Sequence, residues 1–368
     1  MATITKTIGT DSRDYSTMTA WEADLDDVSI YSASDDAVGE VYPDSVYDES
    51  LTINGGSTVG LNSIKLTVPV SEKHNGKASS GPRIVNSTIT IGFIILMDSS
   101  VDTTVEWLEV TSSSSFSDSA MCGGISGGTT AGDHAYQRNV RNCIVHDLIA
   151  SSGDLNGLHF GGSDSALLNN LVYDIVNNQT GSDDCTGIYA YKAGLTSLVE
   201  CYNNTAYLVT NNGGTGRAWG IYFGTGTGGA EKNNISMGTG GTTSGNKNDF
   251  DGTTANSDYN MSEDSTAAGA NSLTGKTISS QFVNTADGSE DLHLLAGSDA
   301  LEAGVDLGTT PANVNIDIDG RNRDYLATTV WDIGADQKSG GAAAKIQFRL
   351  GAMVCQDLGA FSLTTIPS

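Results

Sequence analysis

Two neighbouring carboxylates, Asp183 and Asp184, have residue types and a spacing that could do chemistry. A pair of carboxylates can hydrolyse a glycosidic bond, one as general acid and the other as base or nucleophile. His159 is a further catalytic candidate, because an imidazole titrates near neutral pH. An Asp-rich turn over Ser182–Cys185 explains the same run without catalysis. We favour the turn and predict no catalytic residue.

A second set of residues could bind a ligand. Short runs that open on Gly157, Gly187 and Gly220 each carry an imidazole or phenol ring two residues later. If the apolar residue in between faces the core, these rings stand side by side on one surface, where aromatic faces can stack on sugars. A ring ladder can equally stabilise an exposed sheet or form a subunit contact. The candidate ligand-binding residues are His159, Tyr189, Tyr191, Trp219 and Tyr222.

Metal binding has little support in the sequence. The acidic pairs Asp317/Asp319 and Asp332/Asp336 could hold Ca²⁺, which prefers oxygen ligands. The chain has 5 cysteines and no CxxC pair, so it shows neither a zinc site nor a full disulfide framework, and buried thiols are expected. We predict no metal and no cofactor, with Ca²⁺ as the open alternative.

The elements that position these residues repeat along the chain. Short apolar runs follow Asn residues with start-to-start spacings of 27, 34 and 30 residues, and the Gly runs keep step at 30 and 33. The Asn residues are Asn142, Asn169, Asn203 and Asn233. This spacing is too long for a hairpin meander and lacks the helical periodicity of βαβ units. It predicts an all-β parallel β-helix, with coils paired at about 4.8 Å.

Within the Asn runs, equivalent residues are expected to form columns along the solenoid. Three apolar columns alternate with more polar positions such as Asp147/Asp174, which predicts one buried face. These columns are Ile144/Leu171/Thr205/Ile235, His146/Tyr173/Tyr207/Met237 and Leu148/Ile175/Val209. Doubled Asn at 169–170, 203–204 and 233–234 is expected at turns between sheets, where stacked amides can form a ladder.

The remaining segments suggest three regions. Residues 1–44 are expected to hold an N-terminal strand and a capping helix, with Ser16 or Thr17 as N-cap. Residues 45–337 are expected to form the β-helix, with first coils between Val28 and Val110. Thr111–Gly132 is rich in Ser and Gly and predicts a loop. Residues 338–368 are expected to be a linker and docking tail, anchored by Ile346, Phe348, Leu350, Met353 and Phe361.

Three C-terminal runs carry a resemblance to a known superfamily. FVNTADGSEDLHLLAGSDALEAGVD at 282–306, DIDGRNRD at 317–324 and DIGADQ at 332–337 resemble the C-terminal signature of right-handed parallel β-helix proteins of the pectate-lyase-like superfamily. The chain departs from that pattern at Asn322 and Gln337. Ser182–Cys185 also resembles the GDDC motif of polygalacturonase-type hydrolases, but the accompanying NTD, GHG and RIK motifs are absent. The resemblance implies the right-handed fold and leaves the chemistry open.

Charge and the N-terminal sequence guide the functional prediction. The 368-residue chain carries 44 Asp+Glu against 18 Lys+Arg, a net charge of −26 that disfavours nucleic acid and anionic membranes as partners. TITKTIGTDSRDYSTMTAWEAD contains no apolar run, so we expect no secretory signal and no membrane insertion. The same stretch resembles proteins encoded by environmental bacteriophages.

That resemblance predicts a non-enzymatic virion structural protein, a capsid decoration protein or fibre, made in the host cytoplasm and displayed on the virion surface. The alternatives are a polysaccharide-degrading tailspike or lyase, and a glycan-binding module. Expected partners are further copies of the chain, with a trimer as one option, a capsid or tail protein of the same virus, and a host surface glycan.

Overall fold

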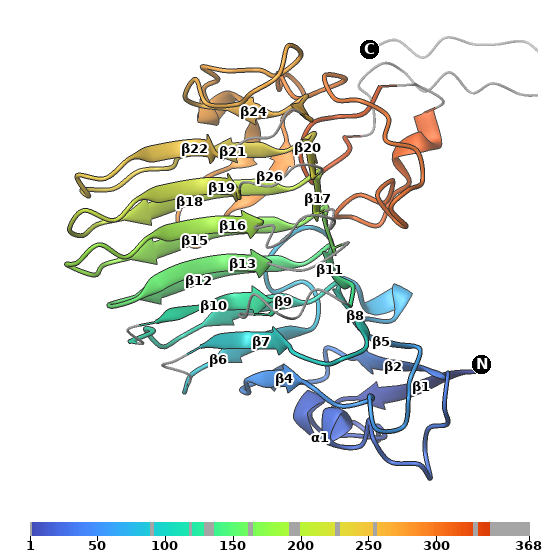
Figure 1. Ribbon diagram of the computed structural model, residues 1–368. Helices are drawn as coiled ribbons and strands as arrows, with labels where there is room; N and C mark the ends of the chain where they lie inside the picture. Colours follow the sequence, from blue (N-terminus) through green and yellow to red (C-terminus); the bar gives the residue numbers. More distant parts are fainter. Residues whose placement is uncertain are drawn as a thin grey trace, which may run out of the picture. The chain divides into compact units, whose positions relative to one another are not determined.

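The computed structural model describes residues 2–88, 92–117, 120–128, 136–160, 165–190, 199–224, 229–252, 256–326 and 330–338. The chain divides into two units, residues 1–338 and 339–368, and the description concerns the first. Three long parallel sheets run along one axis, and the fold is a right-handed parallel β-helix, as predicted (Figure 1). The predicted docking residues Ile346, Phe348, Leu350, Met353 and Phe361 lie outside the described residues.

Each coil contributes one strand to each of three sheets, which we call A, B and C. Sheet A contains β1 (Thr3–Ile8), β2 (Asp36–Val41), β5 (Ser63–Thr67), β8 (Asp102–Glu106), β11 (Arg138–Arg141), β14 (Ser165–Leu168), β17 (Val199–Tyr202), β20 (Ala230–Lys232) and β23 (Ser257–Asp258). Sheet B contains β3 (Val46–Tyr47), β6 (Arg83–Asn86), β9 (Glu109–Ser112), β12 (Ile144–Ala150), β15 (Leu171–Asn177), β18 (Thr205–Asn211), β21 (Ile235–Met237) and β24 (Met261–Ser262). Sheet C contains β4 (Leu51–Ile53), β7 (Phe93–Met97), β10 (Met121–Ser126), β13 (Asp154–Phe160), β16 (Cys185–Ala190), β19 (Ala218–Phe223) and β22 (Lys247–Asp251).

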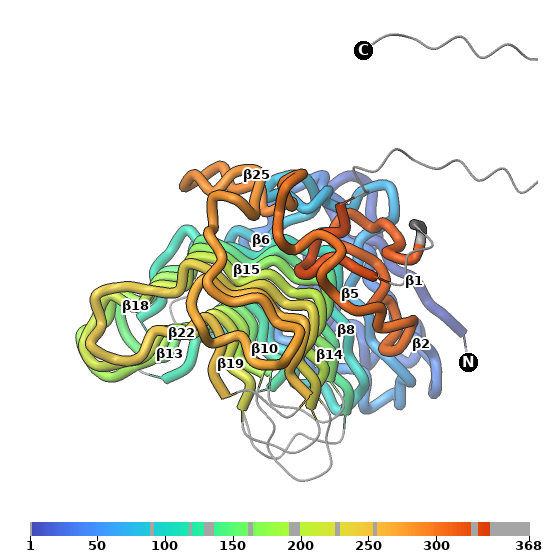
Figure 2. Tube along the Cα trace, turned by 90° about the horizontal axis from the view of Figure 1, so that it is seen from above, coloured from blue at the N-terminus to red at the C-terminus, as the bar shows by residue number. Residues whose placement is uncertain are grey.

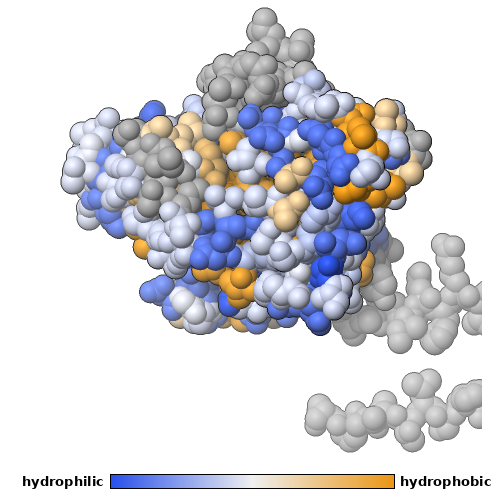
Figure 3. Space-filling model, turned by 90° about the horizontal axis from the view of Figure 1, so that it is seen from below, coloured by the Kyte–Doolittle hydropathy of each residue, from blue (hydrophilic) through white to orange (hydrophobic). Residues whose placement is uncertain are grey.

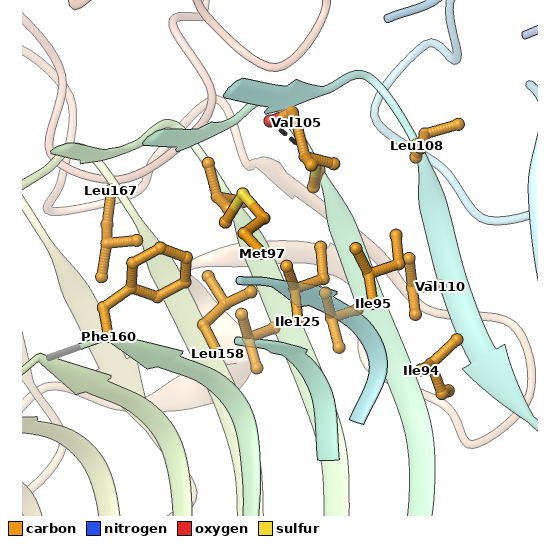
Figure 4. Close-up of a cluster of buried hydrophobic side chains, with 14 of the residues drawn as sticks. Ile94, Ile95, Met97, Val105, Leu108, Val110, Ile125, Leu158, Phe160 and Leu167 are labelled. Carbon is orange, nitrogen blue, oxygen red and sulfur yellow. Dashed lines mark hydrogen bonds between the residues drawn. The ribbon is translucent and has the colours of Figure 1, made fainter. Parts of the chain in front are cut away.

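The inward side chains of the three sheets form one continuous apolar core. Ile95, Ile125 and Leu158 occupy one column of sheet C, and each is completely buried. Figure 4 shows them meeting Val105 and Leu167 from sheet A across the interior. Parallel pairing repeats the same inward positions coil after coil, so the core grows along the axis without widening. Four cysteines, Cys122, Cys143, Cys185 and Cys201, are buried free thiols in this core, as expected.

The N-terminal segment contains the predicted helix, α1 (Met18–Ala23). Thr17 is its N-cap, and its hydroxyl accepts a hydrogen bond from the Ala20 amide at 3.1 Å. Trp21 is buried against Gly39 of β2, where an added Cβ would lie 2.8 Å from the indole ring. Figure 3 views the molecule from the end that carries α1, and hydrophilic or near-neutral side chains cover most of that face. The capping function of α1 stays a prediction.

Coil stacking begins earlier than the repeat pattern predicts. β1 pairs in parallel with β2 over Thr3–Ile8, so the N-terminal strand already belongs to sheet A rather than preceding a solenoid that starts at residue 45. The last coil strand is β24, and residues 263–338 form a C-terminal segment that includes the 3₁₀ turns Ile278–Ser280 and Arg323–Leu326 and the antiparallel pair β25 (Phe282–Asn284) and β26 (Asp291–Leu294). A third 3₁₀ turn, Val70–Glu72, follows β5.

The loop predicted over Thr111–Gly132 is wrong for Met121–Ser126, which is β10 of sheet C. Its Gly residues do not mark a loop, because they allow two coils to approach closely. A Cβ on Gly123 would lie 1.8 Å from the Asn156 carbonyl oxygen of the next coil, and one on Gly124 would lie 2.5 Å from Val145. These glycines therefore allow close packing between strands and between sheets. Composition alone cannot distinguish a glycine in this role from a glycine in a turn.

The predicted columns of sheet B exist, but they do not share one face. Val145 and Val172 point into the solenoid core, whereas Ile144 and Leu171 belong to a second apolar cluster outside it. The parity changes at a residue with left-handed backbone in each strand, Asp147, Asp174 and Leu208, with φ of 51°, 52° and 53°. These left-handed residues stand at the same register in neighbouring strands, and each reverses the inward–outward alternation, so Leu148, Ile175 and Val209 point inward.

The C-terminal segment covers the outer apolar face of sheet B. Phe282, Leu294 and Ile333 pack in the same cluster as Tyr173 and Tyr207. Figure 2 shows this segment, in orange and red, lying across the coils beside β15. Two layers of apolar side chains thus enclose sheet B, one inside the solenoid and one outside it.

No helix among the described residues is both long and apolar enough to cross a bilayer.

The doubled Asn residues turn the chain between sheets A and B, as predicted. The first residue of each pair has a left-handed backbone, with φ of 56° at Asn169 and 57° at Asn203. The second points inward, and Asn170 Nδ2 donates to Asn204 Oδ1 at 2.9 Å. The inward ladder continues to Asn234 and then to Asn260, which the repeat pattern had not identified.

The first Asn of each doubled pair, and the single Asn142 at the equivalent corner, point outward and hold the C-terminal segment. Asn142 Nδ2 donates to the Asp317 carbonyl at 2.6 Å. In the same way, Asn203 Nδ2 donates to the Val314 carbonyl at 2.9 Å. Asn233 Nδ2 donates to the Val305 carbonyl at 2.8 Å. One Asn series therefore joins coil to coil, while the other joins successive coils to the C-terminal segment.

Candidate functional site

The candidate carboxylates lie in the connection between β15 and β16. Such connections between sheets B and C project from the solenoid as a lobe, at the left of Figures 1 and 2. Asp183 Oδ2 accepts a hydrogen bond from the Gly153 amide of the preceding coil at 2.9 Å. Asp184 accepts from the backbone amide and the guanidinium of Arg217 in the next coil, at 2.7 Å from both N and Nη2. Both carboxylates therefore join neighbouring coils.

The predicted ring ladder exists on the outer face of sheet C. His159, Tyr189 and Tyr222 occupy one column, with ring centroids 5.0 and 4.9 Å apart. Leu158 and Ile188 point into the core, as the prediction requires.

Trp219 joins the end of this stack, 4.4 Å from Tyr222, and the Arg217 guanidinium lies 4.2 Å from its ring centroid. Trp219 is only 3% exposed and His159 6%, while Tyr189 and Tyr222 are partly exposed. The rings therefore stack mainly on one another, and a stabilising ladder accounts for these contacts. Tyr191 lies outside the described residues.

His159 is a packed ring whose burial disfavours its charged form. Its Nδ1 lies 3.3 Å from Ser126 Oγ, and the tilted Phe93 ring lies on its other side with centroids 5.6 Å apart. Burial lowers the pKa of His159 to about 4. His159 is therefore neutral at neutral pH, and neighbouring rings cover its imidazole.

His159 should make the protein acid-labile. Because the folded pKa lies below the unfolded value of about 6.5, its stabilising contribution is complete above pH 6.5 and is lost as the pH falls toward 4. We expect His159→Phe to reduce the drop in Tm between pH 7 and pH 5, measured by thermal unfolding. An unchanged drop would contradict this expectation.

His146 provides a control of opposite sign. Hydrogen bonds to Asp147 and Glu109, at 3.0 and 3.1 Å, raise its pKa to about 9 despite burial. Its contribution is present below pH 6.5 and is lost as the pH rises through about 9. His146→Phe should therefore remove the loss of stability between pH 6.5 and about 9 and leave the drop in Tm between pH 7 and pH 5 unchanged.

The acidic pairs considered for Ca²⁺ are part of the C-terminal packing. Asp317 Oδ1 accepts from the amides of Asp319 and Arg321 at 3.0 and 2.7 Å, and burial raises the pKa of Asp317 to about 7. Asp332 Oδ1 accepts from the Glu302 amide at 2.7 Å, and burial raises its pKa to about 6. These carboxylates already have backbone donors as partners.

Asp319 and Asp336 lie with His293 in a group of potential metal ligands. Two of its members are already ion-paired: His293 bridges Asp291 and Asp319, and Arg321 Nη1 lies 2.7 Å from Asp319. Asp336 Oδ2 accepts from the Leu294 amide at 2.9 Å. The negative charge of the group is therefore offset by side chains of the protein.

A pocket on the outer face of sheet A was not predicted. Its volume is about 460 Å³, and its lining is Gln137, Asn139, Arg141, Ala166, Leu168, Glu200, Thr310, Pro311 and Ala312. Arg141 forms one edge, where Nη1 donates to the Ala312 carbonyl at 3.0 Å and Nε pairs with Glu106 at 2.6 Å. The pocket joins three coils to residues far along the chain, and no local sequence pattern indicates that junction.

No protein-family model, curated protein or solved structure shows significant similarity to this chain. The class that the structure defines is the parallel β-helix, through its three stacked parallel sheets and Asn ladder.

Proposed function

We propose that the protein is a non-enzymatic structural protein of a bacteriophage particle, a capsid decoration protein or a fibre, whose β-helix is displayed on the particle surface. One observation carries the non-enzymatic part: the candidate catalytic side chains are engaged in contacts between coils. Asp184 is paired with Arg217, Asp183 accepts from Gly153, and His159 is covered by neighbouring rings.

Physical chemistry supports this choice. A catalytic carboxyl group must be able to reach the substrate, whereas the Asp184 carboxylate is already engaged by the Arg217 guanidinium at 2.7 Å. A β-helix tied by such contacts in successive coils is a rigid rod, which suits a protein that must keep its shape on a particle. The phage assignment rests on the sequence resemblance of residues 3–24 and goes beyond what the fold alone supports.

The proposal predicts no glycan release by the purified protein. Capsular polysaccharide and lipopolysaccharide of the host would be incubated with wild type and with the Asp183→Asn/Asp184→Asn variant, and reducing ends and unsaturated uronates would be measured. Neither protein should exceed the buffer control. Mass spectrometry of purified virions should find the chain at a fixed number of copies. Release by wild type that the double variant loses, or absence from virions, would overturn the proposal.

The pocket on sheet A favours a second candidate, a glycan-binding module. Its lining combines the polar residues Gln137, Asn139 and Glu200 with the apolar residues Leu168 and Pro311. Such a mixture suits a sugar, which offers hydroxyls at its edge and C–H groups on its faces. A glycan array would test it: binding that Gln137→Ala weakens would favour this candidate.

A further inference from the structure

We propose that Asp174, Asp287 and Glu290 form a Ca²⁺ site that fastens the turn between β25 and β26 to the outer face of sheet B. Asp174 lies on β15 and is the left-handed residue of that strand, whereas Asp287 and Glu290 lie in the turn over residues 285–290. One potential ligand atom from each residue lies within 4.8 Å of the other two. The site joins segments more than a hundred residues apart in the chain.

The buried carboxylate of Asp174 is the observation that points to a ligand. Asp174 is 6% exposed, and its Oδ2 is buried with no hydrogen-bond partner. Asp317, which is completely buried, accepts hydrogen bonds from two backbone amides at one oxygen. A buried carboxylate without a donor is costly, and an ion held between it and the turn would provide the missing partner.

The charges around Asp174 point to a cation. The charged groups that act on Asp174 are Glu290, Asp147 and Asp287, and all three are acids. The nearby His146 is committed elsewhere, since its ring nitrogens contact Glu109 and Asp147 at 3.1 and 3.0 Å. Here the cluster differs from the one around His293, where Lys77 and Arg321 offset the acids.

Ligand chemistry selects Ca²⁺ among the common cations. The three side chains offer carboxylate oxygens and no nitrogen or sulfur, which suits a hard ion. Asp287 is exposed and Glu290 partly exposed, so water can complete the coordination. Ca²⁺ accepts irregular sets of six to eight oxygens at about 2.3–2.6 Å, whereas Mg²⁺ demands near-ideal octahedra.

The ion would strengthen a contact that is otherwise modest. Phe282 meets Tyr207 edge-on with centroids 6.0 Å apart, and Tyr207 Oη donates to the Thr285 carbonyl at 3.5 Å. Fixing the turn at residues 287 and 290 would hold the β25–β26 pair over the apolar face around Tyr173 and Tyr207. This site is independent of the function proposed above.

The test uses the full chain after dialysis against EDTA. Isothermal titration with CaCl₂ should show one site in the range of about 10⁻⁵–10⁻³ M, and Ca²⁺ should raise Tm in a concentration-dependent way. Asp287→Asn/Glu290→Gln should weaken binding by about tenfold or more. Asp306→Asn removes an exposed acid of the same segment outside the cluster, and should bind like wild type.

The Asp174→Asn variant distinguishes a cation site from a cluster of acids that only repel one another. Without Ca²⁺ the variant should be more stable than wild type, because it removes one of several crowded acids. In saturating Ca²⁺ it should be less stable, because it removes a ligand. Higher stability under both conditions, no Tm shift at millimolar CaCl₂, or binding abolished by Asp319→Asn but not by Asp287→Asn/Glu290→Gln would each overturn the proposal.

Discussion

Replacing Arg323 by Leu is expected to lower the free energy of unfolding by about 3–5 kcal/mol, the usual cost of removing one member of a buried charged network. The Arg323 guanidinium is fully buried. Its Nη2 donates to the Gly334 and Ala335 carbonyls, both at 2.8 Å, and to Asn169 Oδ1 at 3.1 Å. The variant leaves these acceptors without a donor.

Arg323 also compensates the acids buried beside it. Asp317, Asp332 and Asp336 are the charges that favour its ionised form, against a burial effect that lowers its pKa. Urea unfolding should report the lost stability, and hydrogen exchange should rise in β12 and β15, the strands beneath the C-terminal segment. Arg321→Leu is the matched control, because its ion pair with Asp319 involves a side chain that is 57% exposed. A control as unstable as Arg323→Leu would contradict the argument.

Replacing Asn204 by Leu is expected to cost about 4 kcal/mol, at roughly 1–3 kcal/mol for each buried polar group left unpaired. Asn204 is completely buried in the middle of the inward ladder. Its Oδ1 accepts from the backbone and side-chain amides of Asn170 at 3.0 and 2.9 Å, and its Nδ2 donates to the Leu167 carbonyl at 2.8 Å. Leu fills the space but serves none of these groups.

Asn212→Ala is the control for the ladder. Asn212 also bonds to an Asn of the neighbouring coil, with Nδ2 donating to Asn178 Oδ1 at 2.9 Å, but the pair is exposed. We expect a change below about 1 kcal/mol there, because water can replace the partner. Thermal and urea unfolding of both variants should separate the two positions, and equal losses would show that burial of the ladder is unimportant.

The solenoid is predictable because its signals are local and recur. The Asn pairs require a left-handed backbone at each corner, and the Gly runs place Tyr189 and Tyr222 in one column. Each signal needs only a short window of sequence, and its repetition makes it recognisable. The boundaries of the early coils were harder to predict, because Asn and Gly recur less regularly there.

The outer features of the solenoid required the structure. Whether Ile144 and Leu148 share a face depends on the left-handed backbone at Asp147, and hydropathy does not mark a single left-handed residue. The pocket at Arg141 and the cluster at Asp174 both depend on where residues 263–338 return to the coils. Such contacts join distant residues, and a single sequence carries no pattern for them.

The C-terminal segment that covers sheet B has a consequence for synthesis of the chain. Leu171 emerges from the ribosome about 110 residues before Phe282, its neighbour in the outer cluster, which at about 5–20 residues per second means a delay of roughly 5–20 s. During that interval the coils can already stack while the outer face of sheet B is still bare. A partly synthesised solenoid therefore exposes the apolar outer face of sheet B to other nascent chains. Translation pauses between residues 171 and 282 should favour aggregation more than pauses after residue 338.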